Sequence, residues 1–393
     1  MNAIVIGGNR INAMGLVWSL GEAGHNITLF LNNEGNNNYV NKSKYVKRTI
    51  LIDKDMDVFH ELMKVLTKMD SKPVVFADSD HKAHLLNEHY VELSEFCYLE
   101  GGHPDGSINL YRNKDEEEKL AIKCGFTIPK TVVITKPEEL SEIAMPYPLF
   151  IKANNSIHGT KKATKKCDSK QEAETFVNGL PQDFFPLQVQ EFVEKEYELA
   201  LLGCSLYGGK KVICPVANKK IRHFPKVIGE SCWSLSLDMS SSEELRQLGA
   251  KAALYLQKLE YTGNFSIEFL YANGKFYFLE INLRNDGISW LSTCSGYNLP
   301  DMVCRSFADE NVSADNCTFS QKHYMNILLD WKYVQDGSVK LRQWLKQFNR
   351  DTCYNPYNQN DKRPFFKYLQ VFLKGKFVRI PKRISNKFYK LFT

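Results

Sequence analysis

Long apolar runs and paired cysteine motifs are both missing from this sequence of 393 residues. No window reaches the roughly 20 apolar residues that a membrane-spanning helix needs, which excludes a membrane-spanning protein. The ten cysteines show no Cys-x-x-Cys spacing, so we expect buried free thiols in a reducing compartment. Residues 1–8 contain no basic segment before an apolar core, so we expect no signal peptide and a cytoplasmic protein.

The sequence also lacks a broadly basic main fold. Its formal charge is +6, but residues 361–393 carry +9, which leaves −3 for the other 360 residues. This balance argues against nucleic-acid binding. The tail mixes lysines with aromatic residues, which suits a helix on an anionic membrane surface at the inner face of the membrane. A C-terminal helix packed on the acidic main fold explains the same pattern.

The first third of the chain alternates strands and helices. Residues 4–6 form a β-branched run that ends at Gly7 and Gly8, an amphipathic stretch covers 11–22, and a second apolar run covers 27–31. This β-α-β order predicts a parallel sheet. The glycines do not fit Gly-x-Gly-x-x-Gly, so we expect them to permit close packing, and a dinucleotide-dependent oxidoreductase is disfavoured.

Acidic residues and histidines follow the next predicted strand, residues 73–77. Asp78 and Asp80 stand at its carboxyl end, where open α/β sheets bind ligands, so they are candidates for substrate contact. Three histidines lie on the helix that begins near Asp80, and two of them, His81 and His84, share a face. A metal site is conceivable there, but a polar helix surface is the favoured interpretation.

The middle of the chain places lysines where nucleotide phosphates could bind. Lys114 opens a predicted helix over 113–123, and Lys152 ends an apolar strand over 147–152. A lysine-rich polar hairpin over 154–166 follows. Mobile ammonium groups neutralise several phosphate oxygens, although an exposed hairpin without a ligand has the same composition.

A β-hairpin near residue 273 carries the strongest chemical signal. Residues 261–271 alternate polar and apolar side chains, and residues 275–283 form the return strand. A two-residue loop would place Glu268 and Glu280 on opposite faces, whereas a three-residue loop over 272–274 places them on one face. We predict the three-residue loop, because it separates a polar face from a fully apolar one. The apolar face would hold Phe265, Ile267, Phe269, Tyr277, Leu279 and Ile281.

Two carboxylates and an amide converge on the polar face of this hairpin. Glu268, Glu280 and Asn282 offer the hard oxygen ligands that Mg²⁺ prefers when it bridges nucleotide phosphates. Arg284 follows on the same side, where it can hold an anionic group. The alternative is an exposed polar face without a ligand, which two glutamates this close on a hydrophobic hairpin disfavour.

With these motifs the sequence resembles the ATP-grasp superfamily, whose members include D-alanine–D-alanine ligase, biotin carboxylase and the large subunit of carbamoyl-phosphate synthase. The resemblance covers roughly residues 1–305, and residues 266–284 look like the family's metal hairpin with its Glu-x-Asn-x-Arg ending. Residues 7–16 and 221–225 look most like D-aspartate-ligase-type and carbamoyl-phosphate-synthase-like members.

The resemblance implies a role for each of these residues. Glu280 would bridge two Mg²⁺ ions. Glu268 would complete the ligands of one ion and Asn282 those of the other, and Mn²⁺ would be a substitute for Mg²⁺. Lys114 and Lys152 would hold the α- and β-phosphates of ATP.

The resemblance also implies which residues bind the adenine and ribose of ATP and which face the γ-phosphate or acyl phosphate. The hinge that recognises adenine, largely through backbone groups, would consist of Glu191, Phe192 and Val193. Glu198 would bind the ribose hydroxyls. Arg222 would face the γ-phosphate or an acyl phosphate, together with Arg284. The phosphate-covering loop departs from the family pattern, because residues 154–162 contain only Gly159, and Lys161 stands where glycine is common. We expect lysine side chains to replace part of its backbone cradle.

The predicted fold class is a mixed α/β and α+β protein with the ATP-grasp fold. We expect an N-terminal Rossmann-like parallel-sheet domain over 1–112 and a small, mobile central α+β subdomain over 113–193. An antiparallel-sheet C-terminal subdomain with the metal hairpin would cover 194–305. Residues 306–393 would form an extension with a basic helical tail.

The predicted function is an ATP-dependent carboxylate–amine ligase that forms an acyl phosphate and releases ADP. The alternatives are a bicarbonate-using carboxylase or carbamoyl-phosphate-synthase-like enzyme, and a non-catalytic nucleotide-binding module. The expected partners are a small carboxylate and a small amine, with no nucleic acid. Membrane contact of the tail would suit envelope or surface-polysaccharide synthesis.

Overall fold

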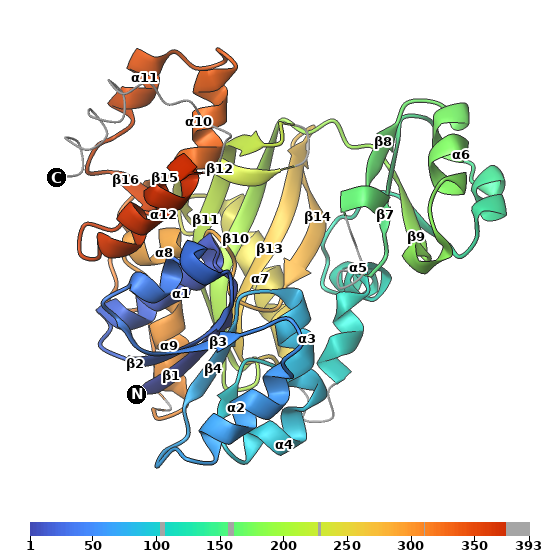
Figure 1. The fold of residues 1–393 in the computed structure, drawn as a ribbon. Helices are drawn as coiled ribbons and strands as arrows, with labels where there is room; N and C mark the ends of the chain where they lie inside the picture. Colours follow the sequence, from blue (N-terminus) through green and yellow to red (C-terminus); the bar gives the residue numbers. More distant parts are fainter. Residues whose placement is uncertain (103–106, 156–160, 227–228, 310, 375–393) are drawn as a thin grey trace.

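The chain folds around three β-sheets with helices packed against them (Figure 1). This computed structural model describes residues 1–102, 107–155, 161–226, 229–309 and 311–374. In these ranges no helix is long and apolar enough to cross a membrane. All ten cysteines are free thiols and seven of them are buried, as the sequence predicts.

The N-terminal sheet contains five parallel strands in the order β3-β2-β1-β4-β5. Its strands are β1 (Asn2–Gly7), β2 (Asn26–Asn32), β3 (Val46–Ile52), β4 (Val74–Ala77) and β5 (Tyr98–Leu99). Its helices are α1 (Ile11–Glu22), α2 (Val58–Leu66), α3 (Asp80–Glu88) and α4 (Tyr90–Ser94), with the 3-10 turns η1 (Gly35–Asn37), η2 (Val40–Lys42) and η3 (Ser107–Arg112). The predicted parallel sheet and the close packing at its first turn are confirmed. A Cβ added to Gly7 would lie 2.7 Å from the Cβ of Ala13 in α1.

The second sheet contains four antiparallel strands in the order β6-β9-β7-β8. Its strands are β6 (Thr131–Ile134), β7 (Leu149–Ala153), β8 (Lys165–Cys167) and β9 (Leu187–Glu191). The accompanying helices are α5 (Lys114–Lys123) and α6 (Lys170–Asn178), with the turns η4 (Pro137–Glu142), η5 (Lys161–Ala163) and η6 (Gln182–Phe184). This lobe, at the right of Figure 1, has its own apolar core, which includes Ile151, Val177 and Val189.

The third sheet contains seven strands in the order β14-β13-β10-β11-β12-β15-β16. Its strands are β10 (Tyr197–Leu206), β11 (Lys211–Phe224), β12 (Glu230–Asp238), β13 (Gly263–Ala272), β14 (Lys275–Asn282), β15 (His323–Asn326) and β16 (Thr352–Asn355). The helices α7 (Glu243–Lys258), α8 (Trp290–Cys294) and α9 (Leu299–Ser306) accompany it. Alternate residues of β10 enter two different cores: Leu201 packs with α7, and Leu202 packs with α1 and α9. The sheet is therefore covered on both faces.

The C-terminal extension is only partly helical. It contains α10 (Ile327–Gln335), α11 (Leu341–Lys346) and α12 (Arg363–Lys374). It also supplies β15 and β16, which pair in parallel at the edge of the third sheet. These two strands are not predicted from the sequence, because runs of four residues carry little periodic signal.

Helix α12 packs its apolar side against the main fold. Phe365 is 1% exposed and shares a core with Trp331 and Trp344. The ring of Tyr368 lies 4.8 Å from the ring of Tyr39. This is the packed arrangement that the sequence analysis left as one alternative for the tail, whose residues 375–393 lie outside the described part.

Candidate functional site

Strands β13 and β14 form the predicted hairpin, but its loop differs from the prediction. Ala272 pairs with Lys275, so the loop consists of Asn273 and Gly274, with φ angles of 50° and 73°. The predicted three-residue loop is therefore wrong. An Asn-Gly pair adopts the left-handed two-residue turn, whose twist matches that of the flanking strands.

A β-bulge next to the glutamates restores the shared polar face. The register shifts by one residue, so that Glu268 lies directly opposite Glu280, and the predicted placement of both glutamates on one face is confirmed. Leu279 is the extra residue of the bulge. Phe278 is consequently 1% exposed in the apolar core, whereas Tyr277 and Leu279 are half-buried. The prediction that the last two lie on the apolar face is wrong, because it assumed an unbroken alternation.

Each hairpin carboxylate pairs with a buried lysine from another element. The Nζ of Lys114, at the start of α5, lies 2.6 Å from the Oε2 of Glu280. The Nζ of Lys220, in β11, lies 2.7 Å from the Oε2 of Glu268. The charge of Lys114 lowers the pKa of Glu280 to about 2. Burial raises the pKa of Glu268, and Lys220 offsets that effect only in part. The site therefore concentrates both signs of charge, with the side chain of Glu268 18% exposed and that of Glu280 34% exposed.

The oxygen donors of the hairpin fit a hard divalent cation. Asn282 follows Glu280 on β14 and lies opposite Ser266 of β13, and its Oδ1 accepts a hydrogen bond from Arg284 at 2.9 Å. Carboxylate and amide oxygens are the ligands that Mg²⁺ prefers. Within the described ranges, no three His, Cys, Asp or Glu side chains gather as a metal site. A metal held by Glu268, Glu280 and Asn282 would therefore need further oxygens, from phosphate or water, to complete its shell.

Lys152 is the second buried lysine of the predicted phosphate site. It lies on β7, is 6% exposed, and its Nζ is 4.0 Å from the Oε1 of Glu118. Burial and the nearby charge of Lys114 lower the pKa of Lys152 to about 8. Burial acts on Lys114 in the same direction, but Glu280 outweighs it and raises the pKa of Lys114. Two buried ammonium groups that repel each other favour the binding of a polyphosphate between them.

Glu198 on β10 lies directly opposite Lys220 on β11. The Nζ of Lys220 is 2.9 Å from the Oε2 of Glu198, and the Nζ of Lys195 contacts the other carboxylate oxygen. Burial alone would raise the pKa of Glu198, but the two lysines lower it to about 2. Lys220 thus connects the predicted ribose acid to Glu268 of the hairpin.

The predicted hinge follows β9 and is held by backbone hydrogen bonds. The N–H of Glu191 donates to the carbonyl of Lys130 at 2.9 Å, and the N–H of Phe192 donates to the carbonyl of Pro148 at 3.2 Å. The hydrogen bonds of the described residues do not include the amide of Val193. This segment therefore keeps a backbone donor that a planar base could use.

Arg284 connects the hairpin to the carboxyl edge of the N-terminal sheet. Its Nε and Nη2 lie 3.0 and 2.8 Å from the carboxylate oxygens of Asp80, at the start of α3. Burial would lower the pKa of Arg284, but Asp80 raises it. Arg112 approaches the same carboxylate at 3.4 Å. Asp78 instead accepts a hydrogen bond from the N–H of Gly8 at 2.6 Å. Of the two predicted aspartates, Asp80 is thus the one in contact with a site arginine.

Arg222 has contacts of a different kind. Its Nε and Nη2 each lie 2.7 Å from the carboxylate of Asp330 in α10, and its Nη2 lies 2.9 Å from the Oε1 of Gln347. Its guanidinium carbon is 5.2 Å from the ring of Trp233. These contacts direct Arg222 toward the C-terminal extension, so its role at a phosphate stays a prediction. Gly159 and the side chain of Lys161 lie outside the described residues.

Three buried residues of the site were not predicted. Lys220 is identified as a site residue only from the register of β10 and β11, which places it opposite Glu198. Glu117 and Glu118 of α5 are 2% and 6% exposed, and burial raises the pKa of Glu117 to about 8. In the sequence they belong to an acidic run at a helix start, where a solvated surface is the ordinary expectation. The helix instead packs these acids beside Lys114 and Lys152.

A family model described as an ATP-grasp domain matches residues 119–295. The carbamoyl phosphate synthase large chain of Saccharolobus solfataricus is 21% identical over 230 residues, or 57% of this chain. The chain spans only 21% of the length of that curated relative.

Solved structures share the overall fold. The biotin carboxylase domain of 2-oxoglutarate carboxylase from Hydrogenobacter thermophilus has a TM-score of 0.65 and 17% identity, over 81% of this chain and 73% of that one. The L-amino acid ligase of Bacillus licheniformis has a TM-score of 0.56 and 16% identity, over 77% and 73%. The family model identifies residues 119–295 as an ATP-grasp domain, and the chain shares its overall fold with these solved structures.

Proposed function

We propose that this protein is an ATP-dependent carboxylate–amine ligase that works through an acyl phosphate and converts Mg-ATP to ADP and phosphate. The observation that carries this proposal is the facing pair of Glu268 and Glu280, each matched with a buried lysine. A reaction between a carboxylate and a polyphosphate brings two anions together. It therefore needs fixed positive charge and oxygen ligands for a cation in a site shielded from water.

ATP would lie between the central lobe and the third sheet. Val193 would offer its backbone to adenine, Glu198 would accept hydrogen bonds from the ribose, and Lys114 and Lys152 would hold the phosphates. Lys220 would keep Glu198 charged and oriented, since it holds that carboxylate at 2.9 Å. When bound by the hairpin ligands, one or two Mg²⁺ ions, or Mn²⁺, would neutralise phosphate oxygens.

Arg284 is the group placed to hold the substrate acid. Its guanidinium already binds one carboxylate, that of Asp80, in a two-point contact. The substrate carboxylate would share this guanidinium while Arg112 retains Asp80. In the first step a carboxylate oxygen attacks the γ-phosphorus, and the bond between that phosphorus and the β–γ bridging oxygen breaks. In the second step the amine nitrogen attacks the acyl carbon, phosphate leaves, and the nitrogen loses a proton.

The experiment that tests this proposal measures ADP release over a matrix of acids and amines. We expect ADP release that depends on an organic acid and a coupled product that depends on the amine. The matrix of acids must include bicarbonate, because one of the similar structures is a biotin carboxylase domain in complex with MgADP and bicarbonate. ADP release with bicarbonate alone would indicate a carboxylase. Binding of ATP without turnover in any arm would indicate a nucleotide-binding module.

Lys152 should make nucleotide binding sensitive to pH. Its pKa in the free protein is about 8, so above that pH it must take up a proton before it can pair with phosphate. We expect the Kd of Mg-ATP to stay constant below about pH 8 and to rise by about tenfold per pH unit above it. Calorimetric titrations across this range measure the slope. The variant Lys152→Arg stays protonated and should lose the slope. A wild-type Kd that stays constant well above pH 8 would contradict this assignment.

A further inference from the structure

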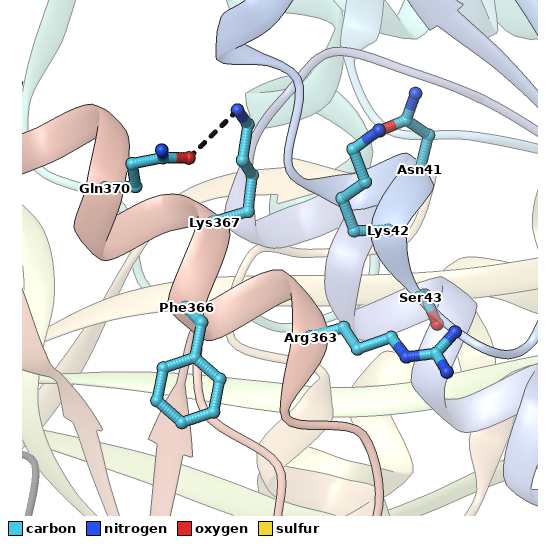
Figure 2. A pocket seen from close by; sticks show the side chains of 7 residues that line it. All are labelled: Asn41, Lys42, Ser43, Arg363, Phe366, Lys367 and Gln370. Carbon is cyan, nitrogen blue, oxygen red and sulfur yellow. Dashed lines mark hydrogen bonds between the residues drawn. The ribbon is translucent and has the colours of Figure 1, made fainter.

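A hollow of about 650 Å³ lies between η2 and the start of α12, away from the hairpin site. Its lining residues are Asn41, Lys42, Ser43, Arg363, Phe366, Lys367 and Gln370 (Figure 2). Three of these seven side chains are cations and none is an acid. Figure 2 shows that the cations come from both sides of the hollow, Lys42 from η2 and the other two from the helix.

The two walls of the hollow are fastened to each other. Asp361, which precedes α12, is 2% exposed. Its Oδ2 accepts hydrogen bonds from the hydroxyl of Ser43 at 2.5 Å and from the Nε1 of Trp18 at 3.1 Å. Its Oδ1 accepts from the N–H of Lys44 at 3.2 Å. These bonds occupy both oxygens of Asp361, and they fix η2 and α12 relative to each other before any ligand binds.

The described part of the chain supplies no acidic partner to the three cations of the hollow. Among the described residues, no carboxylate forms an ion pair with Lys42, Arg363 or Lys367. The Nζ of Lys367 only donates to the Oε1 of Gln370, at 3.2 Å. Like charges gathered around one hollow repel one another, so an anion that neutralises them is bound favourably. The guanidinium of Arg363 supplies a planar fork for two oxygens of a tetrahedral anion, and the two lysines supply point charges.

We propose that this hollow binds a phosphate group, carried either by the headgroup of a membrane lipid or by a soluble phosphate ester. Phe366 lines the hollow beside the cations and offers an apolar surface to the carbon part of such a ligand. The chain beyond Lys374 adds six Lys or Arg and no acid, which increases the attraction of this end of the protein for phosphate. The inference concerns a second site and does not depend on the chemistry of the hairpin.

The test uses the full chain and the double variant Arg363→Gln with Lys367→Gln. The matched control is Arg342→Gln with Lys346→Gln, because these residues have the same types and the same spacing on α11 and line a different hollow. One arm titrates pyrophosphate by calorimetry into wild type and both variants, so that any binding at the nucleotide site, which all three proteins share, cancels in the comparison. The other arm measures sedimentation with phosphatidylcholine vesicles, with and without phosphatidic acid. Thermal unfolding confirms that both variants are folded.

We expect wild type and the control variant to bind alike, and the α12 variant to bind at least about tenfold more weakly. A loss confined to the vesicle arm assigns the phosphate to a lipid headgroup, and a loss in the pyrophosphate arm assigns it to a soluble ester. Equal binding by all three proteins in both arms overturns the proposal.

Discussion

Replacing Glu280 with glutamine is expected to lower ATP turnover by at least about 100-fold, since the loss of outer-sphere partners of a metal alone costs 10–100-fold in affinity or activity. Glu280 faces Glu268 across the hairpin and lies 2.6 Å from Lys114. The variant keeps the shape of the side chain but removes its charge. It therefore weakens the hold on a divalent cation and leaves the ammonium of Lys114 without its counter-charge.

Two measurements separate this effect from a loss of folding. Glu280→Gln should bind Mg-ATP more weakly in calorimetry and show little difference between ATP with and without Mg²⁺, whereas wild type should show a large difference. The control is Glu244→Gln on the exposed side of α7, which should behave as wild type in both assays. Near-normal turnover of the Glu280 variant on the substrate pair found in the acid–amine matrix would show that the metal assignment is wrong.

Replacing Asp330 with asparagine is expected to destabilise the protein by about 3–5 kcal/mol, the usual cost of breaking a buried ion pair from one side. Asp330 is fully buried and binds Arg222 through two contacts of 2.7 Å. It also accepts the indole N–H of Trp344 at 2.8 Å. The substitution leaves the guanidinium of Arg222 in apolar surroundings without a counter-charge. Chemical denaturation measures the change in the free energy of unfolding.

The same helix offers a matched control for this substitution. Asp336, which follows α10, pairs with Lys226 at 2.9 Å, but its side chain is 41% exposed. Asp336→Asn should change stability by less than about 1 kcal/mol, as exposed ion pairs do. Two results together would show that Arg222 contacts the γ-phosphate or acyl phosphate, as the family resemblance implies. Asp330→Asn would be as stable as wild type, and Arg222→Lys would abolish turnover. A large loss of stability in Asp330→Asn indicates that Arg222 secures the C-terminal extension to the third sheet.

The hairpin shows which features of a site can be predicted from a local sequence pattern and which cannot. Alternation along β13 and β14 indicated that one face was polar, and the placement of Glu268 and Glu280 on that face is confirmed. The loop was nevertheless predicted wrongly. The two-residue turn and the extra residue Leu279 each shift the register by one residue in the same direction, and the total shift of two residues keeps Glu268 and Glu280 on one face. A bulge has no simple sequence signature, since it depends on how the neighbouring strands pack.

The sequence by itself determined the β-α-β order that opens the chain, the parallel N-terminal sheet, the shared polar face of the hairpin, and the places of Lys114 at a helix start and Lys152 on a strand. These features depend on the periodicity of apolar residues and on turn chemistry, which act over a few residues. Only the tertiary structure decided that Lys220 joins Glu198 to Glu268, that Asp330 holds Arg222, and that α12 borders a cationic hollow. Each of these contacts joins segments that are distant in sequence. Their partners are therefore selected by the packing of whole sheets and helices, which no local pattern records.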